Sequence, residues 1–222
     1  MYQLLNDGAD VEEQTLDGRT ALHWASEKGD DCIVQLLLRH RAEVNTRDKN
    51  GVTALHLACE SSHISVVRLL LGSGAGLEIR QSKIDHLSDK TGGTVLHWAA
   101  IAGHEDIVGL LLASGAKIEA RNGWYCTPLM LAARYGHCGV VQLLLKQGAD
   151  IEARLDTNET AMHFAVEENR EEMVKLLIDS GADVEAWGSR GTPLEYAIAL
   201  GWTQIAELLR KESESRRKEW WK

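Results

Sequence analysis

The sequence TALH at residues 20–23 decides the fold, because it recurs along the chain with few changes. The later copies are TALH from Thr53, TVLH from Thr94, TPLM from Thr127, TAMH from Thr160 and TPLE from Thr192. Successive copies begin 32 or 33 residues apart, except that 41 residues separate the second copy from the third. A period of this size predicts a repeat architecture, in which stacked units bury surfaces that one unit cannot bury alone.

Other features recur in register with the TALH copies. A pair of small residues follows each copy, as at 132–133, and in several repeats a glycine comes next, as at Gly136. An apolar run such as VVQLLL at 140–145 then leads to GAD at 148–150 or a variant of it. A threonine hydroxyl can satisfy free N–H groups at a helix start, and glycine favours a helix end. Each repeat therefore predicts two short antiparallel helices joined by turns.

This pattern resembles the ankyrin repeat, and the resemblance covers essentially the whole chain. It implies an all-α solenoid of antiparallel helix pairs with projecting β-turn or hairpin loops, with six full repeats after an N-terminal half repeat. We predict one domain over 1–222, divided into a partial repeat 1–14, repeats 15–47, 48–88, 89–121, 122–154 and 155–186, and a last repeat 187–222 with a C-terminal helical extension. The second full repeat contains a loop inserted at about 81–88.

Four histidines occupy the same position of their repeats, and they could suggest a metal site. They are His23, His56, His97 and His163. Stacked helices lie roughly 10 Å apart, whereas zinc needs all its ligands about 2 Å from one ion. The resemblance implies instead that these histidines tie neighbouring backbones by hydrogen bonds. We predict no metal and no cofactor.

Composition narrows the class of protein and of partner. The formal net charge of −9 disfavours nucleic acid, whose phosphates would repel the chain. The four cysteines fit no zinc pattern, and no apolar run is long enough for membrane insertion. No secretory signal opens the sequence, so we expect an intracellular, cytoplasmic or nuclear protein. Because the sequence starts partway through a repeat, we expect a monomer or a fragment of a larger chain.

The resemblance implies that first helices and turn tips line a concave groove that binds partners. Trp, Tyr and Arg are enriched at interface hot spots, and carboxylates favour basic partners. The candidate partner-binding residues are Ile101, Trp124, Tyr125, Arg134, Tyr135, Glu159, Glu167, Glu168, Trp187 and Leu200. Two structural alternatives stay open: Trp124 and Tyr125 fold back on a neighbouring turn, or the charged residues form only a solvated face.

Two tryptophans, the inserted loop and the C-terminal tail also allow predictions. Trp24 and Trp98 lie inside first helices, where we predict core positions. The 81–88 insertion is either a solvated loop or a finger over the groove. The tail after Thr203 is either a capping helix or a contact for a partner.

The sequence therefore predicts a non-catalytic module that binds a protein or peptide carrying basic and apolar residues. The alternative is an enzyme with its active site in the groove, using Glu167 or Glu168 with Tyr135 and Arg134 as acid–base residues. No sequence motif of a known catalytic class supports that alternative.

Overall fold

The computed structural model describes residues 9–82 and 89–220. Across these ranges the regular secondary structure is helical, and the one isolated β-bridge pairs Gly188 with Gly191. Backbone hydrogen bonds close the predicted turns, as in the 2.9 Å bond from Asp48 N to Val52 O. The predicted all-α architecture with projecting turns is confirmed.

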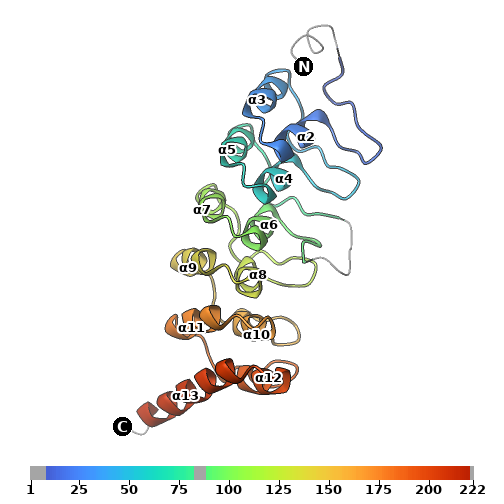
Figure 1. The fold of residues 1–222 in the computed structure, drawn as a ribbon. Coiled ribbons are helices and arrows are strands. Elements are labelled where there is room, and N and C mark those ends of the chain that lie inside the picture. Colours follow the sequence, from blue (N-terminus) through green and yellow to red (C-terminus); the bar gives the residue numbers. More distant parts are fainter. Residues whose placement is uncertain (1–8, 83–88, 221–222) are drawn as a thin grey trace. The chain divides into compact units, whose positions relative to one another are not determined.

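The chain divides into two compact units, and the amino-terminal unit comprises residues 1–124. Its helix pairs are α2 (Ala21–Lys28) with α3 (Asp31–Arg39), α4 (Ala54–Glu60) with α5 (Ile64–Gly72), and α6 (Val95–Ala102) with α7 (Glu105–Ala113). Within this unit α2, α4 and α6 pack as a row of first helices, and α3, α5 and α7 pack as a row of second helices (Figure 1).

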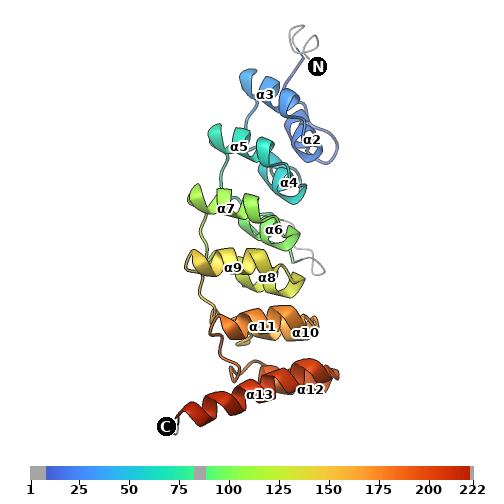
Figure 2. The same cartoon turned by 60° about the vertical axis from the view of Figure 1, so that its left-hand side comes forward.

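The carboxy-terminal unit comprises residues 125–222 and repeats the arrangement. Its pairs are α8 (Pro128–Tyr135) with α9 (Cys138–Lys146), α10 (Ala161–Glu167) with α11 (Glu171–Asp179), and α12 (Pro193–Leu200) with α13 (Thr203–Trp220). The first helices α8, α10 and α12 form one row, and α9, α11 and α13 form the other (Figure 2). The assignment of 1–222 to a single domain stays a prediction.

The repeated threonine begins each first helix through a reciprocal cap. Thr20 is the residue before α2, and its backbone N–H donates to His23 Nδ1 at 3.1 Å. In the last repeat Glu195 Oε2 accepts from the Thr192 N–H at 2.8 Å, so a carboxylate takes over the role of the imidazole. These caps satisfy N–H groups that a helix start would otherwise leave unpaired.

The helices end and pack as the sequence predicts. Gly29 follows α2 with φ +71°, a left-handed conformation that glycine adopts without a Cβ clash. The small pairs that follow TALH are buried, as at Ala99 and Ala100, which lets neighbouring helices approach closely. Second helices contribute fully buried residues such as Leu111 and Leu144. Burial of each such leucine stabilises the fold by roughly 1.5–3 kcal/mol.

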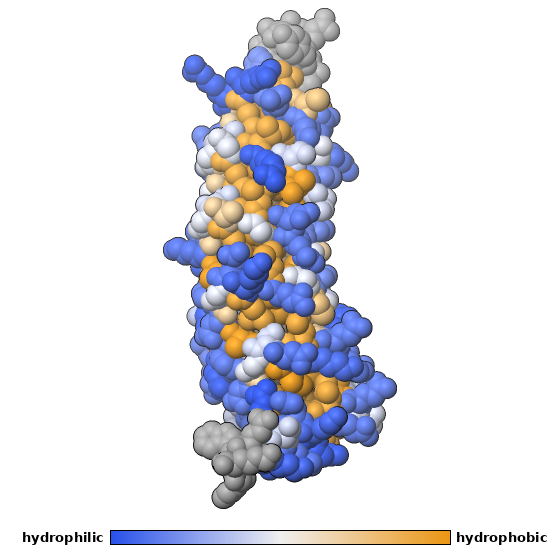
Figure 3. Space-filling view, turned by 90° about the vertical axis from the view of Figure 1, so that its left-hand side faces the viewer, coloured by the Kyte–Doolittle hydropathy of each residue, from blue (hydrophilic) through white to orange (hydrophobic). Residues whose placement is uncertain are grey.

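The second helices also carry apolar residues that are only half buried. Leucines at the same repeat position of α3, α5, α7, α9 and α11 belong to this set: Leu36, Leu69, Leu110, Leu143 and Leu176. Figure 3 looks onto the second helices and shows apolar surface between charged side chains. Partial cover by these charged neighbours is consistent with a solvated outer layer.

The C-terminal tail forms a long helix that contacts the preceding turn. Helix α13 has 18 residues, compared with nine in α11. Arg216 Nη1 donates to Ala182 O at 2.9 Å, and Arg217 pairs with Glu185 at 2.7 Å. These contacts agree with a capping role. Of the predicted insertion, positions 83–88 lie outside the described residues.

The two tryptophans predicted to be core behave differently. Trp98 is buried against Val52 and Leu57, so that prediction is confirmed. Trp24 is 42% exposed, so the prediction of a core position was wrong. Trp98 is covered by the repeat before it, whereas no helix among the described residues precedes α2.

Candidate protein-binding surface

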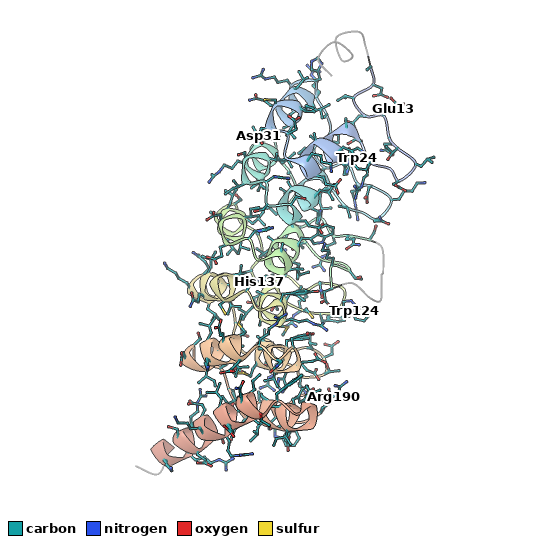
Figure 4. All side chains as sticks on the ribbon, viewed as in Figure 1. Glu13, Trp24, Asp31, Trp124, His137 and Arg190 are labelled. Carbon is teal, nitrogen blue, oxygen red and sulfur yellow. The ribbon has the colours of Figure 1, made fainter. Side chains whose placement is uncertain are left out.

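The turn before α8 presents Trp124 on a constrained backbone. The Trp124 N–H donates to Asn122 Oδ1 at 2.9 Å, and the Gly123 N–H donates to Thr91 O at 2.8 Å. A Cβ at Gly123 would lie 2.9 Å from that Thr91 oxygen, so the close approach requires glycine. Trp124 itself is 41% exposed (Figure 4).

Tyr125 occupies a backbone position that other repeats give to glycine. Two residues before the repeated threonine, the chain is left-handed in the first five copies, with φ +79° at Gly18 and +78° at Gly51. The corresponding residue is Asn158 in the fifth repeat, with φ +69°, and Tyr125 in the fourth, with φ +61°. A left-handed conformation costs a bulky L-residue roughly 1–2 kcal/mol, and asparagine tolerates it better. Tyr125 is nonetheless 55% exposed.

The turn before α12 presents Trp187, which is 65% exposed. The isolated bridge closes this turn, with Gly188 N donating to Gly191 O at 2.9 Å. The carbonyl of Trp187 accepts a long 3.5 Å hydrogen bond from Arg154 Nη1. This backbone contact fixes the turn while the indole stays at the surface.

Arg134 and Glu168 form a direct pair across α8 and the end of α10. Arg134 Nε lies 3.2 Å from Glu168 Oε1, and the guanidinium carbon sits 5.5 Å from the centre of the Phe164 ring. The neighbouring Tyr135 stacks on His137 with ring centres 6.4 Å apart and is 38% exposed. An exposed ion pair of this kind contributes about 0–1 kcal/mol to stability.

Glu159 has a hydrogen-bonding role that the sequence did not reveal. Its Oε1 accepts from the Ser189 N–H at 3.0 Å, from the Ser189 hydroxyl, and from the Tyr196 hydroxyl at 3.0 Å. Burial alone would raise the pKa of Glu159, but the hydrogen bonds from Ser189 and the Thr157 hydroxyl lower that pKa to about 2. The carboxylate thus stays ionised and joins the turn before α10 to the turn before α12.

A small cavity lies beside this network, with a volume of about 180 Å³. Its apolar wall includes Leu155 and Phe164, and its polar residues include Glu159, Glu167 and Arg190. Figure 4 shows Arg190 on the turn side of the carboxy-terminal unit. The structure therefore brings two of the predicted carboxylates to the same hollow.

The remaining predicted residues lie at two separate places. Ile101 is half buried near the end of α6 in the amino-terminal unit. Leu200 ends α12 and is 41% exposed. The sequence reasoning missed Ile198, which is 56% exposed although its repeat position holds buried small residues elsewhere. The exposure of Ile198 could have been predicted from its place in the last repeat, because no first helix of the described residues packs beyond α12.

Exposed large apolar side chains have a distinct distribution across the described residues. They are Leu16, Trp24, Trp124, Tyr125, Tyr135, Trp187, Ile198 and Leu200. Every one lies on a first helix or in a turn, and none lies on a described second helix. In each unit, the exposed large apolar side chains thus lie on the elements that the sequence predicted to bind partners.

The repeated histidines have the structural role that the resemblance implied, where their contacts are described. His23 Nε2 lies 3.1 Å from Val52 O, and His163 Nε2 lies 3.3 Å from Gly191 O. Each bond links one repeat to the turn of the next. His56 is completely buried, and its Nε2 makes no hydrogen bond of normal geometry. The described residues hold no cluster of three metal-ligating side chains.

The geometry defines the class as a stack of helix pairs with projecting turns. The family model for ankyrin repeats matches residues 1–82, 75–154 and 129–218, so the chain belongs to the ankyrin-repeat family. The ankyrin repeat domain of human ASB11 is similar, with 27% identity and a TM-score of 0.77 over 87% of this chain and 84% of that one. A comparison with curated proteins gave no match.

Membership of this family has consequences for function. Ankyrin repeat domains are typically protein–protein interaction modules, and the family is generally non-catalytic. None of the helices in ranges 9–82 and 89–220 is long and apolar enough to cross a membrane.

Proposed function

We propose that this chain is a non-catalytic module that binds a protein or peptide through its first helices and turn tips. The partner presents apolar side chains to the exposed aromatic residues and basic side chains to the carboxylates of the carboxy-terminal unit. Binding involves no chemical step.

The observation that carries this proposal is the conformation of Tyr125. A glycine or asparagine would relieve the left-handed strain, as Gly51 and Asn158 do at equivalent positions. The chain instead keeps a tyrosine there with more than half of its surface exposed. Retention of a strained, exposed aromatic residue is explained when it contacts a partner, because strain at such positions is associated with function.

The alternative, an enzyme in the groove, has weaker support. Its postulated Arg134 is already ion-paired with Glu168, and its postulated Glu167 lines a cavity too small for most small-molecule substrates. Such substrates usually occupy pockets of roughly 300–1,000 Å³. The generally non-catalytic character of the family also favours the binding module.

The test replaces Tyr125 with the residue that the next repeat uses. Immobilised wild type, Tyr125→Asn and the control Asn158→Gly are compared by quantitative capture from native lysate, with circular dichroism to verify folding. We expect Tyr125→Asn to lose specific partners and to gain up to about 1 kcal/mol in the free energy of unfolding. Asn158→Gly should keep the same partners. Identical partner sets for all three chains would contradict the proposal.

A further inference from the structure

The last helix pair has an apolar face that no described helix covers. Helix α12 packs on α10 and α13, and α13 packs on α11, whereas no described helix of the carboxy-terminal unit lies on the other side of the pair (Figure 2). Ile198 is 56% exposed there, although Ala133 and Val166 are completely buried at the same repeat position. Leu194, one turn earlier on α12, is also only half buried, whereas its equivalent Leu129 is 1% exposed. Because a terminal repeat usually presents a polar outer face, these apolar residues indicate a further contact.

A hollow with a volume of about 220 Å³ lies on this face between α12 and α13. Its apolar wall includes Ile198, Trp202 and Ala206. Its charged residues are Glu207 and Arg210. An apolar centre with charged residues at its rim is the usual anatomy of a protein interface.

The two charged residues of this hollow depart from the other repeats. The position of Arg210 holds an aliphatic residue in every other second helix, such as Leu145 in α9 and Ile178 in α11. Glu207 lies one helical turn before Arg210, so both side chains project from the same side of α13. Neither residue forms an ion pair within the described ranges, unlike the arginines nearer the end of the helix.

The order of these two charges matches a second copy of the chain. When two copies of α13 pack antiparallel across a two-fold axis, each residue meets the residue that its own partner contacts. Glu207 of each copy then meets Arg210 of the other, so one acid and one base give two ion pairs. Because α12 runs alongside α13, the same axis pairs α12 with its copy and brings Leu194 of one towards Ile198 of the other. An unrelated helix would need matching charges in a fixed order, whereas a second copy has them by symmetry.

We propose that the outer face of α12 and α13 is an interface between two copies of this chain. Leu194 and Ile198 form its apolar centre, and reciprocal pairs between Glu207 and Arg210 fix its orientation. One helix pair from each copy is a small contact, so the dimer forms in a concentration-dependent equilibrium. The sequence predicted a monomer or a fragment, since the charge pattern matters only once the uncovered face of α13 is known.

The test measures the sedimentation velocity of the full chain from about 1 μM to about 1 mM. Wild type should shift from monomer to dimer across this range, with a smaller dimer fraction at high salt. Glu207→Arg and Arg210→Glu each place like charges opposite one another, so each should weaken self-association by about tenfold or more. An equimolar mixture of these two variants should dimerise again, because opposite charges then face each other at both pairs.

The apolar centre is tested with a matched pair of substitutions. Ile198 and Leu200 are both exposed on α12, but only Ile198 lines the hollow. Ile198→Ser should weaken the dimer by about tenfold or more, because each dimer loses two buried side chains. Leu200→Ser should change the association little, and circular dichroism verifies that both variants are folded.

Three results would overturn the proposal. The first is a wild type that stays monomeric up to the highest concentration. The second is a mixture that associates no better than its two components, since a two-fold interface requires that rescue. The third is a dimer that persists in Glu207→Arg, Arg210→Glu and Ile198→Ser alike. Tyr125→Asn should dimerise as wild type does, so the interface and the proposed partner binding are tested independently.

Discussion

Acidification should destabilise the amino-terminal unit through His56, which is completely buried. Burial lowers the pKa of His56 from 6.5 to about 4, although the backbone of Gly93 acts in the opposite direction. The unfolded chain therefore takes up a proton at higher pH than the folded chain. The stability that the neutral imidazole provides is complete well above pH 6.5 and is lost as pH falls towards 4.

The size of the effect follows from the two pKa values. Between pH 7 and pH 5 the linkage relation gives a loss of about 2 kcal/mol from this one residue. Because the pKa values of His23 and His163 are also lowered by burial, wild type alone cannot isolate His56. The variant His56→Met does so, since Met130 fills the same repeat position and its Sδ accepts from the Thr127 N–H at 3.4 Å.

The assay is hydrogen exchange of peptides covering helix α4 at both pH values, supported by urea unfolding followed by circular dichroism. Exchange reports local stability, which matters because the two compact units need not unfold together. Wild type should lose about 2 kcal/mol more than His56→Met between pH 7 and pH 5. Equal losses in the two proteins would refute the assignment of this pH dependence to His56.

Four further substitutions test the packing and the contact of the tail. Gly188→Ala should destabilise by about 1–3 kcal/mol in urea unfolding, because its Cβ would lie 2.9 Å from Nε2 of the buried His163. Gly72→Ala is the matched case: it lies at the end of α5 with nothing within 4 Å of its Cβ, so it should stabilise by about 0.5–1 kcal/mol. Equal effects of these two changes would contradict the steric argument. Arg216→Ala should speed hydrogen exchange in the turn between α11 and α12 and cost about 1 kcal/mol, since it donates to a carbonyl there. Lys211→Ala is its exposed control, and equal exchange in both variants would show that the tail does not hold the turn.

The sequence was sufficient for the fold because the fold depends on local, repeated chemistry. Thr20 and His23 are three residues apart, and that spacing alone allows the reciprocal cap seen at α2. The buried pair at 132–133 follows from the need for close helix packing. Each of these features depends only on one repeat and its neighbour, so the repeated sequence pattern is enough to predict it.

The candidate site was less predictable because it depends on where a side chain lies relative to other repeats. Trp24 and Trp98 share one repeat position, yet only Trp98 has a preceding repeat that covers it. The sequence predicts Glu159 as a surface carboxylate. Its hydrogen-bond partner Tyr196 is 37 residues away, so the local sequence does not reveal this contact. The exposure of Ile198 likewise follows from its place in the last repeat and not from its local sequence.

Two departures from the repeat differ in their effect on the backbone. Glu195 replaces a histidine, but its carboxylate restores the cap by accepting from Thr192. Tyr125 replaces a glycine and leaves the strained left-handed backbone in place, with φ +61°. The change at Glu195 thus preserves the helix start. A strained and exposed aromatic residue in a turn is consistent with contact to a bound partner, as proposed above. Tyr125 is therefore a stronger guide to recognition than any residue selected for its chemical type alone.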